Sequence, residues 1–203
     1  MKKKTFIIII LIITIFMVFF GGYYLIRPSL KGEKILSDYK IPYPTVIAHR
    51  GSSYHTPEST EIAYKKAVKD GADYLEADLH QTADGKIVIF HDKTLKKTSD
   101  IKEVFPERPD KSISNFTLEE LKKLDIGTWY NKKYPERGND DFEGLEILTL
   151  EELIDISRSG RHNPGLILEL KNPDKYDDME NKIIDILSKK GVLDLFIDGV
   201  NVK

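Results

Sequence analysis

The chain has 203 residues, of which 32% are charged and 40% hydrophobic, and its formal net charge at pH 7 is −2. This balance is that of an ordinary globular protein and predicts a single globular domain. The slightly acidic charge argues against a nucleic-acid partner, which would require a basic surface. The absence of cysteine from the sequence excludes a disulfide framework, a thiolate metal site and a cysteine nucleophile.

The N-terminus combines positive charge with a long apolar segment. Lys2, Lys3 and Lys4 precede an uncharged run over residues 5–26 that is mostly Ile, Leu and Phe. A run of about 20 apolar residues can cross a bilayer as a helix, and lysines before it predict that the N-terminus lies inside. The sequence therefore predicts a single-pass anchor in the cell membrane over residues 1–26, with the rest of the chain extracellular.

Two other interpretations of this segment fit less well. A cleaved signal peptide would have a shorter hydrophobic region and a small-x-small cleavage site, and Gly21-Gly22-Tyr23-Tyr24 is a poor substitute for that site. A helix buried in the core of a soluble protein would show one polar face, and this run has none.

The segment from residue 45 to residue 90 alternates between strand-like and helix-like patterns, after a proline-containing connector over residues 27–44. Short apolar runs predict strands, and apolar residues spaced by three and four positions predict a helix. Gly71 ends the predicted helix, and Asp84-Gly85 indicates a turn between the second and third apolar runs. The predicted strands cover residues 46–48, 73–80 and 87–90, and the predicted helix covers residues 59–69.

The remaining part of the chain begins with a long polar stretch over residues 93–146, whose pattern predicts a single helix over residues 118–124. We interpret this stretch as an insertion beside the mouth of the fold. Strands alternating with helices predict a parallel sheet with crossover helices. Beyond the insertion, the pattern predicts a helix over 149–158, a strand over 165–170, a helix over 174–190 and a strand over 192–197.

Charged clusters lie at or just past the ends of four predicted strands. They are His49-Arg50, Glu76-x-Asp78, His91-Asp92 and Glu169-x-Lys171. Residues two apart on a strand point to one face, so the members of each spaced pair project together. In a (β/α)₈ barrel the carboxyl ends of the strands form the rim of the active site. A parallel arrangement would therefore bring all four clusters together.

Three of the charged residues are carboxylates that suit a metal ion. Glu76, Asp78 and Glu169 offer hard oxygen ligands of the kind that Mg²⁺ and Ca²⁺ prefer. Carboxylates crowded together repel one another unless a cation lies between them. We therefore predict a site for a divalent metal, Ca²⁺ or Mg²⁺, at these three residues.

The other candidates suit the chemistry of a phosphate group. Arg50 and Lys171 add positive charge, which a phosphate would complement. His49 and His91 titrate near neutral pH and can move protons. A bound metal would polarise a phosphoryl oxygen and offset the charge of the transition state.

Each cluster also has a structural explanation when it is taken alone. A histidine after a strand is often structural, and Glu-x-Asp and Glu-x-Lys pairs are common on solvated surfaces. Their joint occurrence favours function, because charge beside a buried strand is costly unless it is paired or binds a ligand. His55, His80 and His162 lack such neighbours and are interpreted as structural, although His80 continues the face of the Glu-x-Asp pair. Trp129 suits a substrate wall and core packing equally well.

Longer motifs accompany these clusters in a specific order. They are Ala48–Gly51, Pro57–Thr60, Glu76–Gly85, Val88–Asp92, Leu124–Trp129, Leu148–Glu152 and Leu168–Lys171. From about residue 45 to the end, the sequence resembles the glycerophosphodiester phosphodiesterase family. The resemblance implies a (β/α)₈ (TIM-type) barrel with a small inserted region after the third strand. It also implies hydrolysis of small glycerophosphodiesters to glycerol 3-phosphate and an alcohol.

The resemblance also implies a role for each cluster. His49 and His91 carry the acid–base chemistry, the three carboxylates bind a divalent metal, and Arg50 contacts phosphate. A neighbouring hydroxyl of the glycerol attacks phosphorus first, so that no protein nucleophile is needed. With the predicted anchor, the catalytic domain would be extracellular. Two local departures from the family are mild: Ser59 stands where Asn is usual, and Leu148 where Pro is usual.

The main departure from the family is length. The chain stops at Lys203, in or just after the predicted fifth strand, whereas such a barrel usually needs about 250 residues. We therefore expect a barrel truncated after about the fifth strand, with exposed sheet edges. Two alternatives to a membrane-anchored enzyme stay open. One is a truncated, inactive remnant, and the other is a lysophospholipase D-type phosphodiesterase that acts on lipid.

Overall fold

The computed structural model describes residues 3–26, 28–38, 40–176 and 178–193. The chain divides into two compact units, Met1–Pro44 and Thr45–Lys203, which are described separately.

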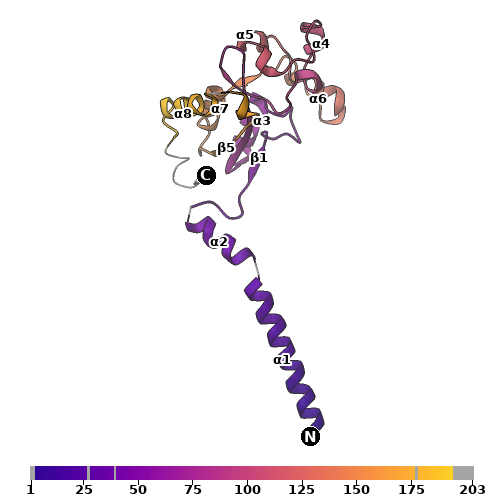
Figure 1. Ribbon diagram of the computed structural model, residues 1–203. Helices are drawn as coiled ribbons and strands as arrows, with labels where there is room; N and C mark the ends of the chain where they lie inside the picture. Colours follow the sequence, from indigo (N-terminus) through magenta and orange to yellow (C-terminus); the bar gives the residue numbers. More distant parts are fainter. Residues whose placement is uncertain (1–2, 27, 39, 177, 194–203) are drawn as a thin grey trace. The chain divides into compact units, whose positions relative to one another are not determined.

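The first unit contains two helices, α1 (Lys3–Ile26) and α2 (Pro28–Asp38) (Figure 1). The apolar run of the sequence thus forms a helix. Among the helices of the described residues, none is long and apolar enough to cross a membrane. The predicted transmembrane anchor is therefore not confirmed.

The second unit is built on a sheet whose central strand is β2. The strands are β1 (Ile47–His49), β2 (Tyr74–Gln81), β3 (Ile87–Ile89), β4 (Leu148–Thr149) and β5 (Gly165–Leu170). β2 pairs in parallel with β1 and β5, whereas β3 pairs antiparallel with both β2 and β4. Because β1 and β3 pair with different segments of β2, and β5 overlaps both segments, β1 and β3 share one edge of β2 and β5 takes the other.

The expectation of an all-parallel sheet is wrong for β3. Residues 82–86 join β2 to β3, and a parallel crossover needs about a dozen residues or more. Thr82 closes this turn: its backbone N–H donates to the carbonyl oxygen of Lys86 at 2.9 Å, and its Oγ1 accepts from the Lys86 N–H at 2.9 Å. Gly85 adopts a φ of 75°, which glycine tolerates at little cost. The Asp84-Gly85 turn therefore makes a hairpin.

Three helices pack on the sheet (Figure 1): α3 (Glu61–Asp70), α7 (Leu150–Ser157) and α8 (Met179–Lys189). Thr60 caps α3 by accepting from the Ala63 N–H, and Gly71 ends it with a φ of 87°. Thr149 caps α7 in a reciprocal capping box with Glu152. The apolar faces of these helices and the sheet form one core, which contains Tyr64, Leu75, Leu79, Leu153, Met179 and Ile183 among others.

The insertion predicted over residues 93–146 is more ordered than its polar sequence suggested. Its short helices are η1 (Leu95–Lys97), α4 (Ile101–Val104), η2 (Ile113–Asn115), α5 (Leu118–Leu121), α6 (Thr128–Lys133), η3 (Pro135–Arg137) and η4 (Asp140–Phe142). They surround a second hydrophobic cluster that includes Phe90, Ile101, Phe116 and Leu121. Helices of four to six residues are too short to produce a clear apolar period, so the sequence indicated only the one near residue 118.

The described sheet is open at both sides. β1 and β5 each pair only with β2 among the described residues. Of the strand predicted over 192–197, Val192 and Leu193 are not in a strand, and the rest lies outside the described residues. Of the expected truncated (β/α)₈ barrel, the α/β class is confirmed, as a partial sheet with covering helices that mixes parallel and antiparallel strands.

Candidate active site

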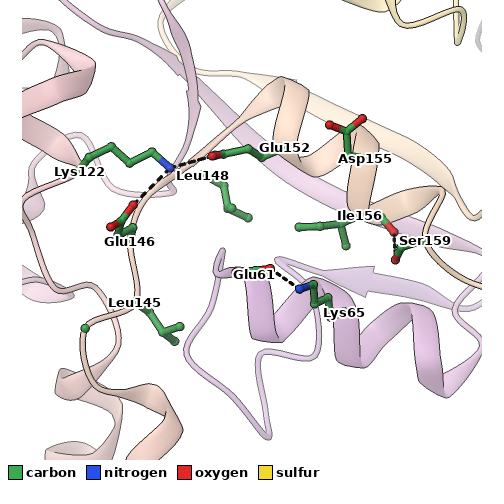
Figure 2. A pocket seen from close by; sticks show the side chains of 11 residues that line it. Glu61, Lys65, Lys122, Leu145, Glu146, Leu148, Glu152, Asp155, Ile156 and Ser159 are labelled. Atoms are coloured by element: carbon green, nitrogen blue, oxygen red, sulfur yellow. Dashed lines mark hydrogen bonds and ion pairs between the residues drawn. The ribbon is translucent and has the colours of Figure 1, made fainter.

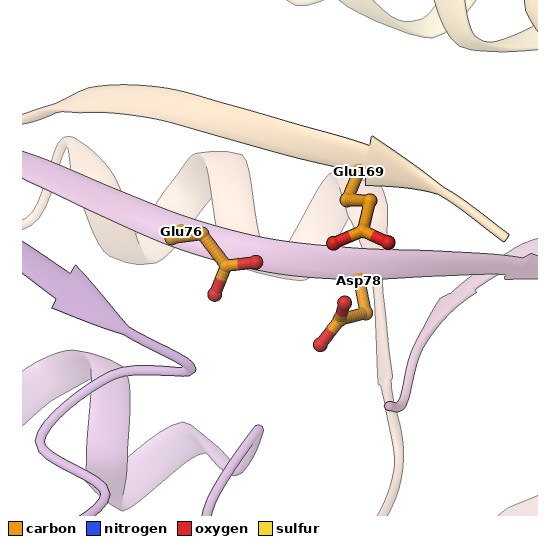
Figure 3. Close-up of side chains that lie close together, drawn as sticks. All are labelled: Glu76, Asp78 and Glu169. Atoms are coloured by element: carbon orange, nitrogen blue, oxygen red, sulfur yellow. The ribbon is translucent and has the colours of Figure 1, made fainter. Parts of the chain in front are cut away.

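The three predicted metal ligands come together on one face of the sheet. Glu76 and Asp78 are two positions apart on β2, so their side chains share one face. The parallel register of β5 sets Glu169 directly opposite Asp78. One carboxylate oxygen from each residue lies within 4.8 Å of the others. Figure 3 shows the three carboxylates converging from these two neighbouring strands.

The environments of the three carboxylates differ. Asp78 is almost fully buried, Glu76 is largely buried and the side chain of Glu169 is 59% exposed. Burial raises the pKa of Glu76, and the neighbouring Asp78 adds to this effect. The pKa of Glu169 is lowered instead, chiefly by its hydrogen bond from Lys171. The surroundings of Glu76 therefore disfavour its charged form relative to a carboxylate in water, and a cation beside it would offset this effect.

Two cations flank the buried Asp78. Lys171 Nζ lies 2.7 Å from Asp78 Oδ1 and also donates to Glu169 Oε1. Burial alone would lower the pKa of Lys171, but these two interactions outweigh it and raise the pKa. Arg50 Nε lies 3.3 Å from Asp78 Oδ2, and Arg50 Nη1 donates to Glu58 Oε1 at 3.1 Å.

One oxygen of this cluster lacks a hydrogen bond. Asp78 Oδ2 is buried and, among the described residues, accepts none, because Arg50 Nε is close to it without the geometry of a donor. An unsatisfied buried polar group costs about 1–3 kcal/mol. An oxygen-only donor set with an unsatisfied buried oxygen fits a hard divalent cation such as Mg²⁺ or Ca²⁺. Glu76, Asp78 and Glu169 would hold it.

The loop after β1 is shaped to hold Arg50 over this cluster. Arg50 has a φ of 55° and Gly51 a φ of 79°, and a Cβ on Gly51 would approach Ala63 to 2.7 Å. Only glycine fits there. The Arg50 N–H donates to Glu76 Oε2 at 2.9 Å. The imidazole Nε2 of His49 lies 3.9 Å from the same oxygen, so His49 joins the cluster from an exposed position.

His91 reaches the site through the hairpin. Because β3 runs back along β2, the Phe90 N–H donates to the carbonyl oxygen of Asp78 at 3.0 Å, and His91 follows immediately. The nearby His91 contributes to the lowered pKa of Glu169. The imidazole Nδ1 lies 2.6 Å from Asp92 Oδ1. A carboxylate bonded to one ring nitrogen orients the other nitrogen for proton transfer.

Two residues of the quoted motifs assist the predicted ones in roles that the sequence did not predict. Glu58 accepts from Arg50 and lies in the Pro57–Thr60 motif, which could have indicated it. Asp92 orients His91, to which it is adjacent. His80 is buried with its Nε2 3.5 Å from the carbonyl oxygen of His91, and burial lowers its pKa. His80 therefore lies nearer to the site than its interpretation as a structural residue implied.

A separate pocket of about 550 Å³ lies between α3, α7 and the insertion (Figure 2). None of the four charged clusters lines it. Its charged groups form ion pairs, including Glu61 with Lys65 and Lys122 with Glu146 and Glu152. This pocket is thus distinct from the carboxylate cluster.

Comparison with known proteins gives a consistent result. A model of the glycerophosphoryl diester phosphodiesterase family matches residues 49–195. The chain is similar to a glycerophosphodiester phosphodiesterase of Bacillus subtilis, with 40% identity over 147 residues, which are 72% of this chain and 46% of the relative. It is also similar to one from Caldanaerobacter subterraneus, with 39% identity over 111 residues, which are 55% of this chain and 39% of the relative.

Solved structures show the same similarity. A phosphodiesterase of Oleispira antarctica in complex with the product sn-glycerol-3-phosphate matches with a TM-score of 0.60 and 32% identity, over 72% of this chain and 53% of that one. A glycerophosphodiester phosphodiesterase of Agrobacterium tumefaciens matches with a TM-score of 0.57 and 27% identity, over 73% and 54% of the two chains. The chain thus spans about half the length of the relatives it matches.

Proposed function

Because the chain belongs to the glycerophosphoryl diester phosphodiesterase family, we propose that it hydrolyses glycerophosphodiesters to glycerol 3-phosphate and an alcohol. The observation that carries the proposal is the cluster of Glu76, Asp78 and Glu169, in which a buried carboxylate oxygen lacks a hydrogen bond. The Oleispira relative was solved with sn-glycerol-3-phosphate, which supports a product of this class.

The carboxylates and cations would bind the phosphodiester together. A divalent cation, Ca²⁺ or Mg²⁺, held by the three carboxylates would polarise a phosphoryl oxygen and offset developing negative charge. The side chains of Arg50 and Lys171 form ion pairs with Asp78. An anionic phosphodiester above that residue would take these two cations as hydrogen-bond donors.

The histidines would carry the protons. Attack by the neighbouring glycerol hydroxyl on phosphorus would form a cyclic phosphate and release the alcohol, so this hydroxyl must lose a proton and the departing alcohol must gain one. Water would then open the cyclic phosphate to glycerol 3-phosphate, losing a proton as the hydroxyl regains its own. Beside the buried His80, His49 and His91 are the imidazoles at this end of the described sheet that are partly exposed. His91 is held by Asp92 and His49 is 65% exposed beside Glu76, so each retains a ring nitrogen for this exchange.

The test is release of glycerol 3-phosphate from glycerophosphocholine by the 203-residue chain. We expect turnover that EDTA abolishes, Ca²⁺ or Mg²⁺ restores and His91→Ala eliminates. Hydrolysis that persists in EDTA, or in His91→Ala, would contradict the proposed mechanism. Lysophosphatidylcholine as a parallel substrate separates a lysophospholipase D-type activity from this one.

A second candidate function is binding of a divalent cation without turnover, which the carboxylate cluster alone would support. Metal-dependent thermal stabilisation without release of glycerol 3-phosphate would favour this candidate.

A location at the cell membrane, with the catalytic unit extracellular, stays a prediction. It is supported by the three N-terminal lysines and by exposed apolar side chains on α1, such as Phe16 and Phe19. Separating membranes from soluble extract, followed by protease treatment of intact cells, tests it. Recovery in the soluble extract would contradict it.

A further inference from the structure

Side chains of the insertion bind the loop between β1 and α3 at one residue, Tyr54. Arg137 Nη1 donates to the carbonyl oxygen of Tyr54 at 2.6 Å, and the hydroxyl of Tyr130 donates to the same oxygen. The guanidinium carbon of Arg137 also lies 4.4 Å from the centroid of the Tyr54 ring. Three interactions from a distant part of the sequence thus meet on a single loop residue.

A hydrogen bond connects this contact to the candidate active site. Ser53, which precedes Tyr54, donates from its Oγ to the carbonyl oxygen of His49 at 2.9 Å. The side chain of His49 is 65% exposed and the residue Tyr54 is 69% exposed. Gly51 is buried against Ala63 and Arg50 is bonded to Glu76, but Tyr54 and His55 are exposed, so hydrogen bonds to the insertion restrain this tip of the loop.

The two residues that bind Tyr54 are themselves held firmly. Tyr130 is buried and packs with its ring centroid 4.9 Å from that of Tyr134 and 5.6 Å from that of Phe142. Glu136 accepts from Arg137 Nε at 3.0 Å, which leaves Arg137 Nη1 directed at Tyr54. The insertion therefore presents two oriented donors to the loop.

We propose that Tyr130 and Arg137 are positioning residues that fix the loop carrying His49 and Arg50. Through these two residues, called the clamp below, the insertion restrains the loop that follows His49. The consequence for hydrolysis rests on the proposed function, whereas the clamping of the loop does not.

The experiment uses hydrogen exchange in the full chain. The N–H groups of Ser52, His55 and Thr56 are hydrogen-bonded, so their exchange reports opening of the loop. We expect Tyr130→Phe and Arg137→Gln each to speed this exchange about three- to tenfold, as expected for the loss of one hydrogen bond.

Two matched variants control for general destabilisation. Tyr134→Phe removes a hydroxyl of the same aromatic group. Arg108→Gln removes an arginine that stacks on Phe105 and Phe116 elsewhere in the insertion. Both should leave exchange in residues 49–56 unchanged, even where Arg108→Gln lowers the melting temperature.

Kinetics supply the second measurement. If the chain hydrolyses glycerophosphocholine, the variants Tyr130→Phe and Arg137→Gln should lower kcat about tenfold, because misplacement of His49 affects mainly the chemical step. KM should change little, because Glu58 and Glu76 still hold Arg50. Exchange equal to that of the native chain in folded Tyr130→Phe and Arg137→Gln would overturn the proposal. So would faster exchange with unchanged kcat. If the native chain is inactive, the proposed function fails, and the exchange result alone decides the clamp.

Discussion

Asp78 in the sheet and Asp125 in the insertion are two carboxylates in opposite situations. Asp125 accepts from the backbone N–H groups of Gly127, Thr128 and Gly144, at 2.7, 2.9 and 3.1 Å, and from the Thr128 hydroxyl. Asp78 is more buried, yet one of its oxygens accepts no hydrogen bond from the described residues. Its nearest charged partners, Arg50 and Lys171, are side chains rather than backbone groups.

The difference separates a carboxylate that builds structure from one that is available to a ligand. Backbone donors join the turn that contains Asp125, Gly127 and Thr128 to Gly144, and together with the Thr128 hydroxyl they use the acceptor capacity of the Asp125 carboxylate. By contrast, Asp78 Oδ2 can still accept a hydrogen bond or coordinate a cation, and the positive charges of Arg50 and Lys171 lie beside Asp78. The proposed metal site therefore lies where a buried group is incompletely satisfied.

The largest expected effect is on catalysis, at Glu169. Because its side chain is exposed and pairs mainly with Lys171, Glu169→Gln should change stability by less than about 0.5 kcal/mol. Loss of a direct metal ligand should lower hydrolysis by at least about 100-fold. Thermal melting and a glycerol 3-phosphate assay measure the two effects. A large drop in melting temperature would show that Glu169 is structural, like Asp125.

The next effect concerns metal binding. A divalent cation at 100 times its Kd should raise the free energy of unfolding by about 2.7 kcal/mol. Titration with Ca²⁺ and Mg²⁺, followed by thermal melting, measures this. Asp125→Asn should keep the shift and Glu169→Gln should lose most of it. An equal shift in both variants would place the cation elsewhere.

A smaller effect is expected on stability at Asp125. Burial alone would raise the pKa of Asp125, but the hydrogen bonds from Thr128, Gly127 and Gly144 outweigh it, so the folded-state pKa is lowered. Its stabilisation is thus present above the unfolded pKa of about 3.9 and is lost as the pH falls through the folded-state value. Asp125→Asn should cost about 1–2 kcal/mol near pH 7 and progressively less below pH ~4.

Urea unfolding at several pH values measures this difference. A cost that does not depend on pH would mean that the charge of Asp125 is irrelevant to folding. The kcat of folded Asp125→Asn should equal that of the native chain. Glu169→Gln should show the opposite pattern, with kcat lowered and stability kept.

The smallest effect compares matched caps in the two regions. Thr117 caps α5 in the insertion and Thr149 caps α7 on the sheet, each in a reciprocal capping box. Thr117→Ala and Thr149→Ala should each cost about 1 kcal/mol. Equal costs in urea unfolding would indicate that insertion and sheet unfold together. A cost at Thr149 alone would show that the insertion opens before the rest.

Much of this architecture follows from local sequence. The apolar runs before His49 and before Lys171 form the strands β1 and β5 by pairing with β2, although Val46, Ile47 and Ile167 stay exposed in the described structure. The helix ends also follow from local sequence. The side chains of Thr60 and Thr149 accept hydrogen bonds from free N–H groups at the starts of α3 and α7, and Gly71 ends α3 with a positive φ angle. The grouping of Glu76 with Asp78 needs only the two-residue period of a strand.

The sequence by itself determined these elements, the residue types of the candidate site and the family. The hairpin that brings His91 beside Asp78 is also local, because residues 82–86 are too few for a crossover, although the strand–helix alternation favoured a parallel β3. The packing of whole elements set β5 beside β2, so that Glu169 lies opposite Asp78. It also decided which carboxylate is left unsatisfied and that Tyr130 and Arg137 meet Tyr54. Local patterns reflect backbone propensity and burial over a few residues, whereas these contacts join groups far apart in the chain and depend on how whole elements pack.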